Sequence, residues 1–298
     1  MVPNRRRGYR RMGDDEALSW IKRVVDERPT YGYRRVTAVV NRLRGKEGLG
    51  RINHKRVYRL MQRHNMLLAR HTGSHVPRVH DGKVITLHSN TRWCSDGYEF
   101  TCWNGDIVRG VFIIDTADRE IISHCAVFNA GVSGSDVRDM LITAVEQRFG
   151  THQAPRRIEV LTDNGSPYRA KLTRQFVSQL GMASHFTPVA SPESNGAAEA
   201  FVKTLKRDYL NISPVPDGPT ALAQIPQWVE DYNECHPHSG LKMLSPREHR
   251  RALKQTARLS GQLGATTGSI DRMRMMPTAE VCWLMSFLFC QVLLIVPA

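Results

Sequence analysis

The sequence lacks the signatures of several protein classes. None of its six cysteines forms a Cys-x-x-Cys pair, and their scatter suits reduced thiols in a cytosolic protein rather than a disulfide framework. His71 and His75 have a spacing suited to a metal, but no Cys-x-x-Cys pair follows them, so we expect no zinc site there. A Gly-x-x-x-x-Gly-Lys-Ser/Thr loop, which would support ATP-driven chemistry, is absent. The sequence has no internal repeat, and no apolar segment follows Met1, so we expect no secretory signal.

Positive charge is present but unevenly distributed along the 298 residues. A content of 41% hydrophobic and 23% charged residues is that of an ordinary soluble globular protein, with room for one large domain and a small one. Residues 1–80 contain 20 of the 42 Lys and Arg residues but 6 of the 28 Asp and Glu residues, so they carry the whole net charge of +14. A block this basic indicates a polyanionic partner, most simply nucleic acid, and a solvated basic face is the alternative.

The basic block has the pattern of three short helices. Asp14 and Asp15 can cap the first, the second is expected near residues 34–43, and Asn53 can cap the third. In the third helix the basic side chains share one arc and the apolar side chains share the opposite one. A recognition helix needs one face that packs and one that meets phosphates and base edges, although a generic surface helix has a similar pattern. The basic arc consists of Lys55, Arg56, Arg59 and Arg63.

A polar connector around residues 70–84 leads into a different pattern. Three strands are followed by a helix, a strand, a helix, a strand and a long helix, an order that predicts an α/β fold with one mixed sheet. The strands are "TRWCSDGYEF", "VRGVFIIDT", "EIISHCAVF", "IEVLTD" and residues 184–187, and the helices lie near residues 135–149, 169–180 and 197–210.

Three carboxylates lie in elements that the predicted fold can bring together. Asp96 lies in the first strand, Asp163 ends the fourth, and Glu199 lies in the first turns of the long helix. Adjacent parallel strands can place the two aspartates side by side, and the helix can bring the glutamate against them. Such carboxylates repel one another unless divalent cations neutralise them, and two Mg²⁺ ions can act on a phosphodiester. The alternatives are a strand-end acid, a turn former and an acid favoured by the helix dipole, respectively.

The spacing of these acids resembles a known signature. Thirty-five residues separate Asp163 from Glu199, and Lys206 follows Glu199 by seven, as in the Asp, Asp, Glu signature of retroviral integrases and related bacterial transposases. The closest resemblance, over about residues 15–255, is to the second-frame protein of two-frame insertion sequences of family three. It rests on "YGYRRVTAVVNRL" and "NHKRVYRLM" in a helix-turn-helix, and on "LTDNGSPY", "SPESNGAAEAFVKTLKRDY" and "YNECHPHSGLKMLSPREH" in the core.

The resemblance implies a fold and a domain order. The fold is an RNase H-like mixed sheet flanked by helices, preceded by a small all-α helix-turn-helix domain. The expected boundaries are residues 1–80 for the basic helix-turn-helix region, 81–258 for the catalytic core and 259–298 for a tail outside the core. Two departures are visible: the integrase zinc module is absent, and Gly97 follows the first acid where a branched apolar residue is expected.

The resemblance also implies an activity. Asp96, Asp163 and Glu199 would be the catalytic, metal-binding triad, with two Mg²⁺ or Mn²⁺ ions. The chain would be a transposase subunit that cleaves DNA strands at element ends and transfers them to a target. Its partners would be double-stranded DNA, an upstream-frame DNA-binding product in a fusion, and further copies of itself, in the bacterial cytoplasm and without a membrane. A catalytically silent DNA-binding regulator and an RNase H-type nuclease are the rivals, the latter without need of the basic helices.

Several residues near the triad have two interpretations each. Lys203 and Lys206 share the helix face of Glu199 and could hold DNA phosphates, or Lys203 could simply pair with Glu199. Asn164 and Gly165 would let the chain turn sharply and leave Asp163 exposed to metal. The loop residues His236, His238 and Ser239 lie near the substrate according to the resemblance, but we expect satisfied polar side chains there.

The tail has an apolar run. The resemblance stops beyond Arg258, and residues 281–296 are sixteen without a charge. A membrane span needs about 20 such residues, so we interpret the run as extra sequence after the functional module rather than as an anchor.

Overall fold

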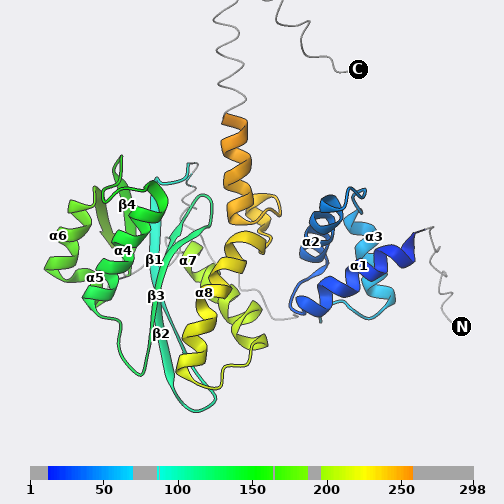
Figure 1. The fold of residues 1–298 in the computed structure, drawn as a ribbon, viewed down its shortest axis with the longest axis horizontal. Helices are drawn as coiled ribbons and strands as arrows, with labels where there is room; N and C mark the ends of the chain where they lie inside the picture. Colours follow the sequence, from blue (N-terminus) through cyan, green and yellow to red (C-terminus); the bar gives the residue numbers. More distant parts are fainter. Residues whose placement is uncertain (1–12, 70–85, 87, 164, 187–195, 258–298) are drawn as a thin grey trace, which may run out of the picture. The chain divides into compact units, whose positions relative to one another are not determined.

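The computed structural model describes residues 13–69, 86, 88–163, 165–186 and 196–257. The chain divides into two compact units, residues 1–249 and 250–298, and the first contains both the N-terminal helices and the sheet (Figure 1). The predicted connector at residues 70–84 and the predicted tail from 259, with its apolar run, lie outside the described residues. In the part of the chain that is described, no helix is both long and apolar enough to cross a membrane.

Three helices form the N-terminal domain, as the sequence predicts: α1 (Asp14–Glu27), α2 (Tyr33–Lys46) and α3 (His54–Arg63). Each turns an apolar stripe inward, because apolar residues recur at helical spacing. The shared core is separate from those of the sheet and includes Ile21, Val24, Val36, Val40, Val57, Leu60 and Met61.

The first residues of these helices confirm one predicted cap and correct another. The side-chain oxygen of Asn53 accepts a hydrogen bond from the backbone N–H of Lys55 at 2.9 Å, so the predicted cap of α3 is confirmed. The predicted cap of α1 by Asp14 and Asp15 is wrong. Gly13 caps this helix in a left-handed conformation (φ 78°) without a side-chain bond, while Asp14 is buried against other partners.

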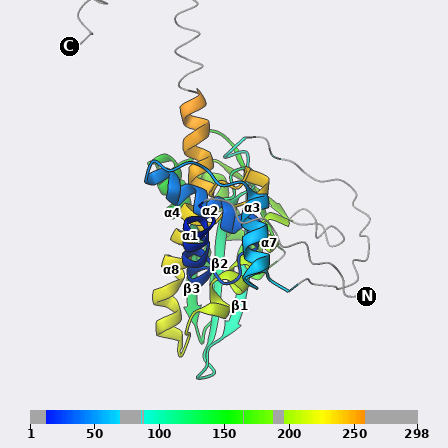
Figure 2. The ribbon, with the colours of Figure 1, turned by 90° about the vertical axis from the view of Figure 1, so that its right-hand side faces the viewer.

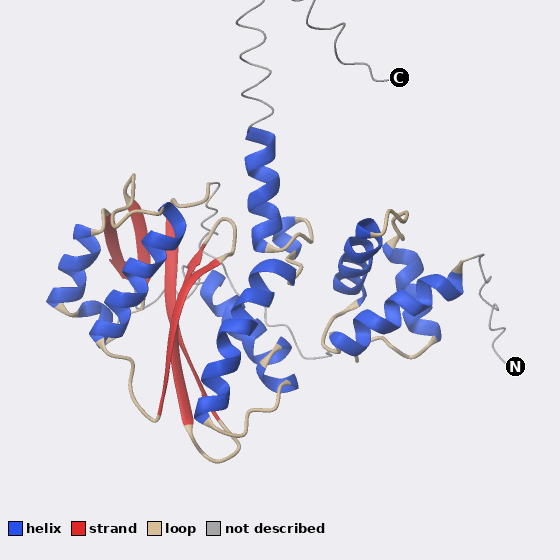
Figure 3. Ribbon diagram, viewed as in Figure 1, coloured by secondary structure: helices blue, strands red, loops and turns tan. Residues whose placement is uncertain are grey.

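The sheet is mixed, as predicted, and has the order β3-β2-β1-β4-β5. The first three strands are antiparallel neighbours, whereas β4 runs parallel to β1 and β5 parallel to β4. Gly97 lies within β1 and pairs with Val111, so the strand continues through the unexpected glycine. The strands, red in Figure 3, are β1 (Arg92–Thr101), β2 (Ile107–Asp115), β3 (Ile121–Phe128), β4 (Ile158–Thr162) and β5 (Met182–Phe186).

Helices cover both faces of the sheet because the strands alternate their apolar side chains. In β2, Val111 and Ile113 belong to one core, and Phe112 and Ile114 belong to the other. The first core includes residues of α4 (Gly134–Phe149) and α6 (Lys171–Gln179), and the second includes residues of α7 (Gly196–Asp208) and α8 (Gly218–Cys235). Figure 2 shows α8 alongside β2 and β3.

The helix predicted near residues 169–180 is α6, and a short helix that was not predicted lies before it. A short α5 (Ser166–Arg169) precedes α6, and the break falls at Ala170, whose backbone is extended with ψ 133°. Short 3₁₀ turns follow α7 at Leu210–Ile212 and α8 at Ser239–Leu241, and residues 246–257 are helical.

Candidate active site

The register of two parallel strands brings Asp96 and Asp163 to the same level. The last registered pair between β1 and β4 is Cys94 with Leu161, and each aspartate follows its strand's member of that pair by two residues. Cys94 and Leu161 both belong to the core on the face covered by α7 and α8. Because strand side chains alternate with a period of two, Asp96 of β1 is directed to that same face, and Asp163 directly follows the last residue of β4.

Glu199 reaches this face from the first turn of α7, a helix that packs against β1. Asp96 lies within electrostatic range of the other two acids. Burial raises the pKa of the Asp96 carboxyl above its ordinary value, and the negative charges of Asp163 and Glu199 raise it further. A hydrogen bond from the backbone N–H of Gly97 acts in the opposite direction. The fold therefore gathers acids that repel one another at the edge of its core.

Each carboxylate also has a local partner. Asp96 accepts the bond from Gly97 at 2.8 Å, and Asp163 accepts one from the backbone N–H of Gly165 at 3.0 Å. The carboxylate of Glu199 lies 3.6 Å from the Lys203 ammonium, which is the helix pair considered from the sequence. Among the described residues, no group of three or more Asp, Glu, His or Cys side chains has the arrangement that holds a metal ion.

Gly165 affects the space beside Asp163 rather than supplying backbone freedom. Its φ is −58°, which any residue adopts. A β-carbon at this position would lie 2.9 Å from Oδ1 of Asp163, closer than real contacts allow. The predicted sharp turn at Asn164 lies outside the described residues. The glycine thus leaves room for the carboxylate beside its own N–H.

The chemistry of the donors fits a hard divalent cation. All three groups are carboxylates, and oxygen ligands are those that Mg²⁺ prefers. A cation would also relieve the repulsion that raises the pKa of Asp96. To enclose it, Asp163 and Glu199 would have to turn from their local partners, which are one backbone N–H and one exposed lysine.

The helix of Glu199 carries the two predicted lysines on its exposed side. Lys203 is exposed and pairs weakly with Glu199 across 3.6 Å, while Lys206 is exposed and has no acidic partner within the described parts of the chain. The Lys206 ammonium is therefore open to solvent, whereas that of Lys203 lies near Glu199.

Two arginines of the predicted basic arc are held by a buried acid. Asp14 is 3% exposed and accepts from Arg56 at 2.8 Å and from Arg59 at 2.9 Å. These arginines thus join α3 to α1, whereas Lys55 and Arg63 are exposed on α3. Arg59 thus lies on the predicted basic arc opposite the apolar side chains and also contacts a buried acid of its own domain.

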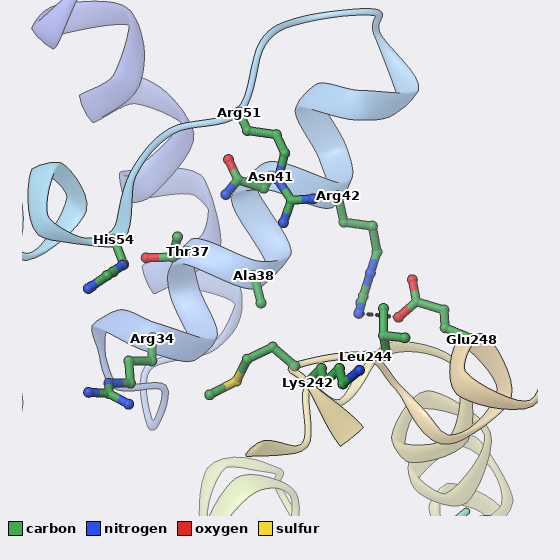
Figure 4. A pocket seen from close by; sticks show the side chains of 11 residues that line it. Arg34, Thr37, Ala38, Asn41, Arg42, Arg51, His54, Lys242, Leu244 and Glu248 are labelled. Atoms are coloured by element: carbon green, nitrogen blue, oxygen red, sulfur yellow. Dashed lines mark hydrogen bonds and ion pairs between the residues drawn. The ribbon is translucent and has the colours of Figure 1, made fainter. Parts of the chain in front are cut away.

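A second basic surface was not found from the sequence. A pocket of about 510 Å³ lies between α2 and the chain at Lys242–Glu248. Figure 4 shows Arg34 and Arg51 at this pocket and the ion pair of Arg42 with Glu248, at 2.5 Å. Arg34, Arg51 and Lys242 have no acidic partner among the residues described. No periodic pattern identifies them, because they come from a helix, a connector and a turn.

The loop after α8 differs from expectation. His236 and His238 are buried or partly buried, and among the described residues the Nε2 atoms of both have no hydrogen-bond partner. The interpretation as satisfied polar residues is therefore wrong for these atoms. Asn233, just before them, was missed: its side chain accepts from the N–H of Ile121 and donates to its carbonyl, both at 2.9 Å.

Family models match most of the chain. An HTH-like domain matches residues 12–73, and integrase core domains match residues 87–192 and 180–246. These matches agree with the predicted order of a small helical domain before an RNase H-like mixed sheet.

Sequence relatives agree with the family models. The transposase InsD of insertion element IS2 from Escherichia coli is 49% identical over 248 residues, which are 82% of this chain and 81% of that protein. An insertion element IS136 protein of Agrobacterium fabrum is 61% identical over 192 residues, 64% of this chain and 98% of that protein. A solved chain of a simian T-cell lymphotropic virus intasome is 18% identical with a TM-score of 0.45, covering 70% of this chain and 73% of that one. From its family models and its sequence relatives, the chain belongs to the insertion-element transposases and carries an HTH-like domain followed by an integrase core domain.

Proposed function

We propose that this transposase cleaves DNA at the ends of its element and joins the freed ends to a target, with Asp96, Asp163 and Glu199 as its catalytic residues. The observation that carries the proposal is the strand register: two parallel strands present aspartates level with each other on the face where α7 presents Glu199. The mutual repulsion at Asp96 supports it, because acids that serve only locally need not approach one another.

The three carboxylates would hold two Mg²⁺ or Mn²⁺ ions. Such ions supply an activated water or 3′-hydroxyl and stabilise the leaving oxygen at phosphorus. The carboxylates position the reacting phosphodiester at the sheet edge, and the same set serves cleavage and strand transfer because both are displacements at phosphorus. Lys203 and Lys206 hold neighbouring phosphates of the DNA.

The N-terminal domain holds the duplex. Lys55 and Arg63 meet DNA from the exposed side of α3. The side chains of Arg56 and Arg59, which pair with Asp14, are about a quarter exposed and meet DNA with that exposed part. The pocket of Figure 4 adds cations from α2 and the turn at Lys242. Active complexes contain further copies of the chain and the upstream-frame DNA-binding product, in the bacterial cytoplasm where the DNA lies.

The test is strand cleavage of a duplex that carries the terminal sequence of the element. We expect nicking at the element boundary with Mg²⁺ or Mn²⁺ and none with EDTA, measured with and without the upstream-frame product. Binding without nicking in both preparations would support the silent regulator instead. Preferential cleavage of an RNA–DNA hybrid would support the RNase H-type nuclease.

A further inference from the structure

A second pocket, of about 430 Å³, lies beside the first turns of α7. Its described walls contain three arginines and two histidines but no acidic residue. Two of the arginines already have carboxylate partners: Arg92 pairs with Glu159 at 2.6 Å and Arg35 with Asp208 at 3.3 Å. Arg119 has no acidic partner among the described residues. This arginine–histidine pocket therefore has an uncompensated positive charge.

The histidines give the pocket unpartnered polar atoms. His236 is fully buried, its Nδ1 lies 2.9 Å from the Tyr31 hydroxyl, and its Nε2 has no hydrogen-bond partner in the described part of the chain. His238 also has an unpartnered Nε2 and packs edge-on against His236, with ring centroids 4.9 Å apart. With the tyrosine hydroxyl as donor to Nδ1, the proton of the neutral His236 ring lies on Nε2. A buried N–H without an acceptor is unfavourable, so an oxygen atom is expected there.

The protonation of both rings is consistent with a role as neutral donors. Burial, together with the charges of Arg35 and Arg119, lowers the pKa of His238 to about 3. Burial also lowers the pKa of His236, and the charges of His238 and of nearby arginines lower it further. Near neutral pH each ring is uncharged and carries one N–H. The pocket thus combines a fixed cation with neutral N–H donors, a combination suited to an anion and unsuited to a metal cation.

The position of the pocket relates it to the carboxylates. Gly196, Ala197 and Ala200 of α7 form one of its walls, and Glu199 belongs to the same helical turns. A DNA strand that places one phosphodiester at the triad carries further phosphates on both sides of it. The absence of bulky side chains on this wall lets a backbone approach closely.

We infer that the arginine–histidine pocket binds a backbone phosphate of the DNA strand held at the carboxylates, through Arg119, His236 and His238. The inference rests on the proposed function, because it needs DNA at the triad. It fixes one phosphate beside the reacting one and so sets the position of the strand relative to Glu199.

The first experiment measures DNA binding without cleavage. The full chain with Asp163→Asn and the same chain with Arg119→Gln added bind a labelled end-sequence duplex at several salt concentrations. We expect Arg119→Gln to weaken binding several-fold and to reduce the slope of log affinity against log salt by about 0.9, the loss of one phosphate contact. The matched control is Arg174→Gln, which removes the same charge from an exposed position on α6. Equal slopes for Arg119→Gln and its parent would overturn the inference.

The second experiment locates the phosphate. Methylphosphonate replaces one phosphate at a time in each strand of the duplex. We expect one position at which this neutral group weakens the parent several-fold but does not weaken Arg119→Gln. His238→Gln, which retains an amide donor, should keep the affinity closer to the parent than His238→Ala. If every position affects the parent and Arg119→Gln equally, the pocket does not hold a backbone phosphate.

Two further comparisons distinguish a failure of the pocket assignment from a failure of the proposed function, and DNA phosphate from free phosphate. A parent that binds no duplex at all would contradict the proposed function itself, whereas a parent that binds with an unchanged Arg119→Gln slope would contradict only the pocket. Inorganic phosphate, compared with chloride at equal ionic strength, tests for a free anion. Thermal stabilisation by inorganic phosphate that requires Arg119, together with an unchanged DNA slope, would assign the pocket to free phosphate and overturn the DNA assignment.

Discussion

At the scale of single residues, position 165 links the backbone to the proposed chemistry. A β-carbon there would lie 2.9 Å from Oδ1 of Asp163, and the carboxylate can yield because it ends a side chain. Gly165→Ala should therefore displace the carboxylate and lower Mg²⁺-dependent cleavage, while the free energy of unfolding changes by less than about 1 kcal/mol. Chemical denaturation and nicking of the end duplex measure the two effects.

The control is Gly131→Ala, a loop position where a β-carbon would have no atom within 4 Å. Unaltered cleavage by Gly165→Ala, equal to that of Gly131→Ala, would show that the close contact does not position Asp163.

Arg59 shows that a basic side chain on the exposed arc of α3 can also contact a buried acid of its own domain. It lies 2.9 Å from the buried carboxylate of Asp14, which Arg56 also contacts. Arg59→Ala should lower the free energy of unfolding by about 1–2 kcal/mol, because a buried charged acceptor loses one of its donors. Lys55→Ala, which changes an exposed residue of the same helix, should cost less than about 0.5 kcal/mol. Equal stabilities for the two variants would contradict the role of the Asp14 contact.

The buried histidines predict a pH dependence of stability. The pKa of His238 is lowered to about 3 by burial, so the unfolded chain takes up a proton below about pH 6.5 and the folded chain does not. Stability from this residue is therefore complete above pH 6.5 and falls as the pH is lowered toward 3. His238→Gln should reduce the loss of unfolding free energy between pH 7 and pH 5 by about 1–2 kcal/mol. Denaturation at both pH values tests this, with the exposed His88 as control, and an unchanged difference would refute it.

Between secondary-structure elements, the side chain of Asn233 hydrogen-bonds α8 to the start of β3. Asn233 is 1% exposed and makes two bonds, both 2.9 Å long, to the backbone of Ile121. Asn233→Ala should lower the free energy of unfolding by about 2–4 kcal/mol, because a buried N–H and C=O lose their partners. Gln227→Ala, at an exposed position of the same helix, is the control. A loss below about 0.5 kcal/mol would mean that α8 is held by its apolar contacts alone.

The elements were predictable where a local pattern determines them. Apolar periodicity and β-branched runs predicted the helices and strands, and their order predicted the parallel neighbours that align Asp96 with Asp163. Local patterns do not contain partners distant in sequence. Asp14 meets arginines that lie more than 40 residues away, so its first-turn position suggested a cap, and Asn233 pairs with a strand 112 residues earlier. The break at Ala170 has no glycine or proline at that residue to indicate it.

Across the whole molecule, the net charge of each region does not reveal where basic side chains lie without acidic partners. All of the +14 lies in residues 1–80, so the sequence assigns DNA binding to the N-terminal domain. The remainder is formally neutral, yet Arg119, Lys203 and Lys206 are basic positions near α7. Pairing contributes to the difference, because many acids among the described core residues already have arginine partners, as Asp115, Asp118 and Glu120 do with Arg148. DNA contacts are therefore expected on both domains.

The proposed function requires that Asp96 of β1, Asp163 after β4 and Glu199 of α7 act together as one catalytic site. Its most direct test is strand cleavage of the end duplex with Mg²⁺ by Asp96→Asn, Asp163→Asn and Glu199→Gln, each compared with Asp139→Asn, an exposed acid of α4. We expect each of the three variants to bind the duplex like the parent and to cleave at background, while Asp139→Asn retains cleavage. Near-parental cleavage by any one of the three would contradict the claim and remove that residue from the site.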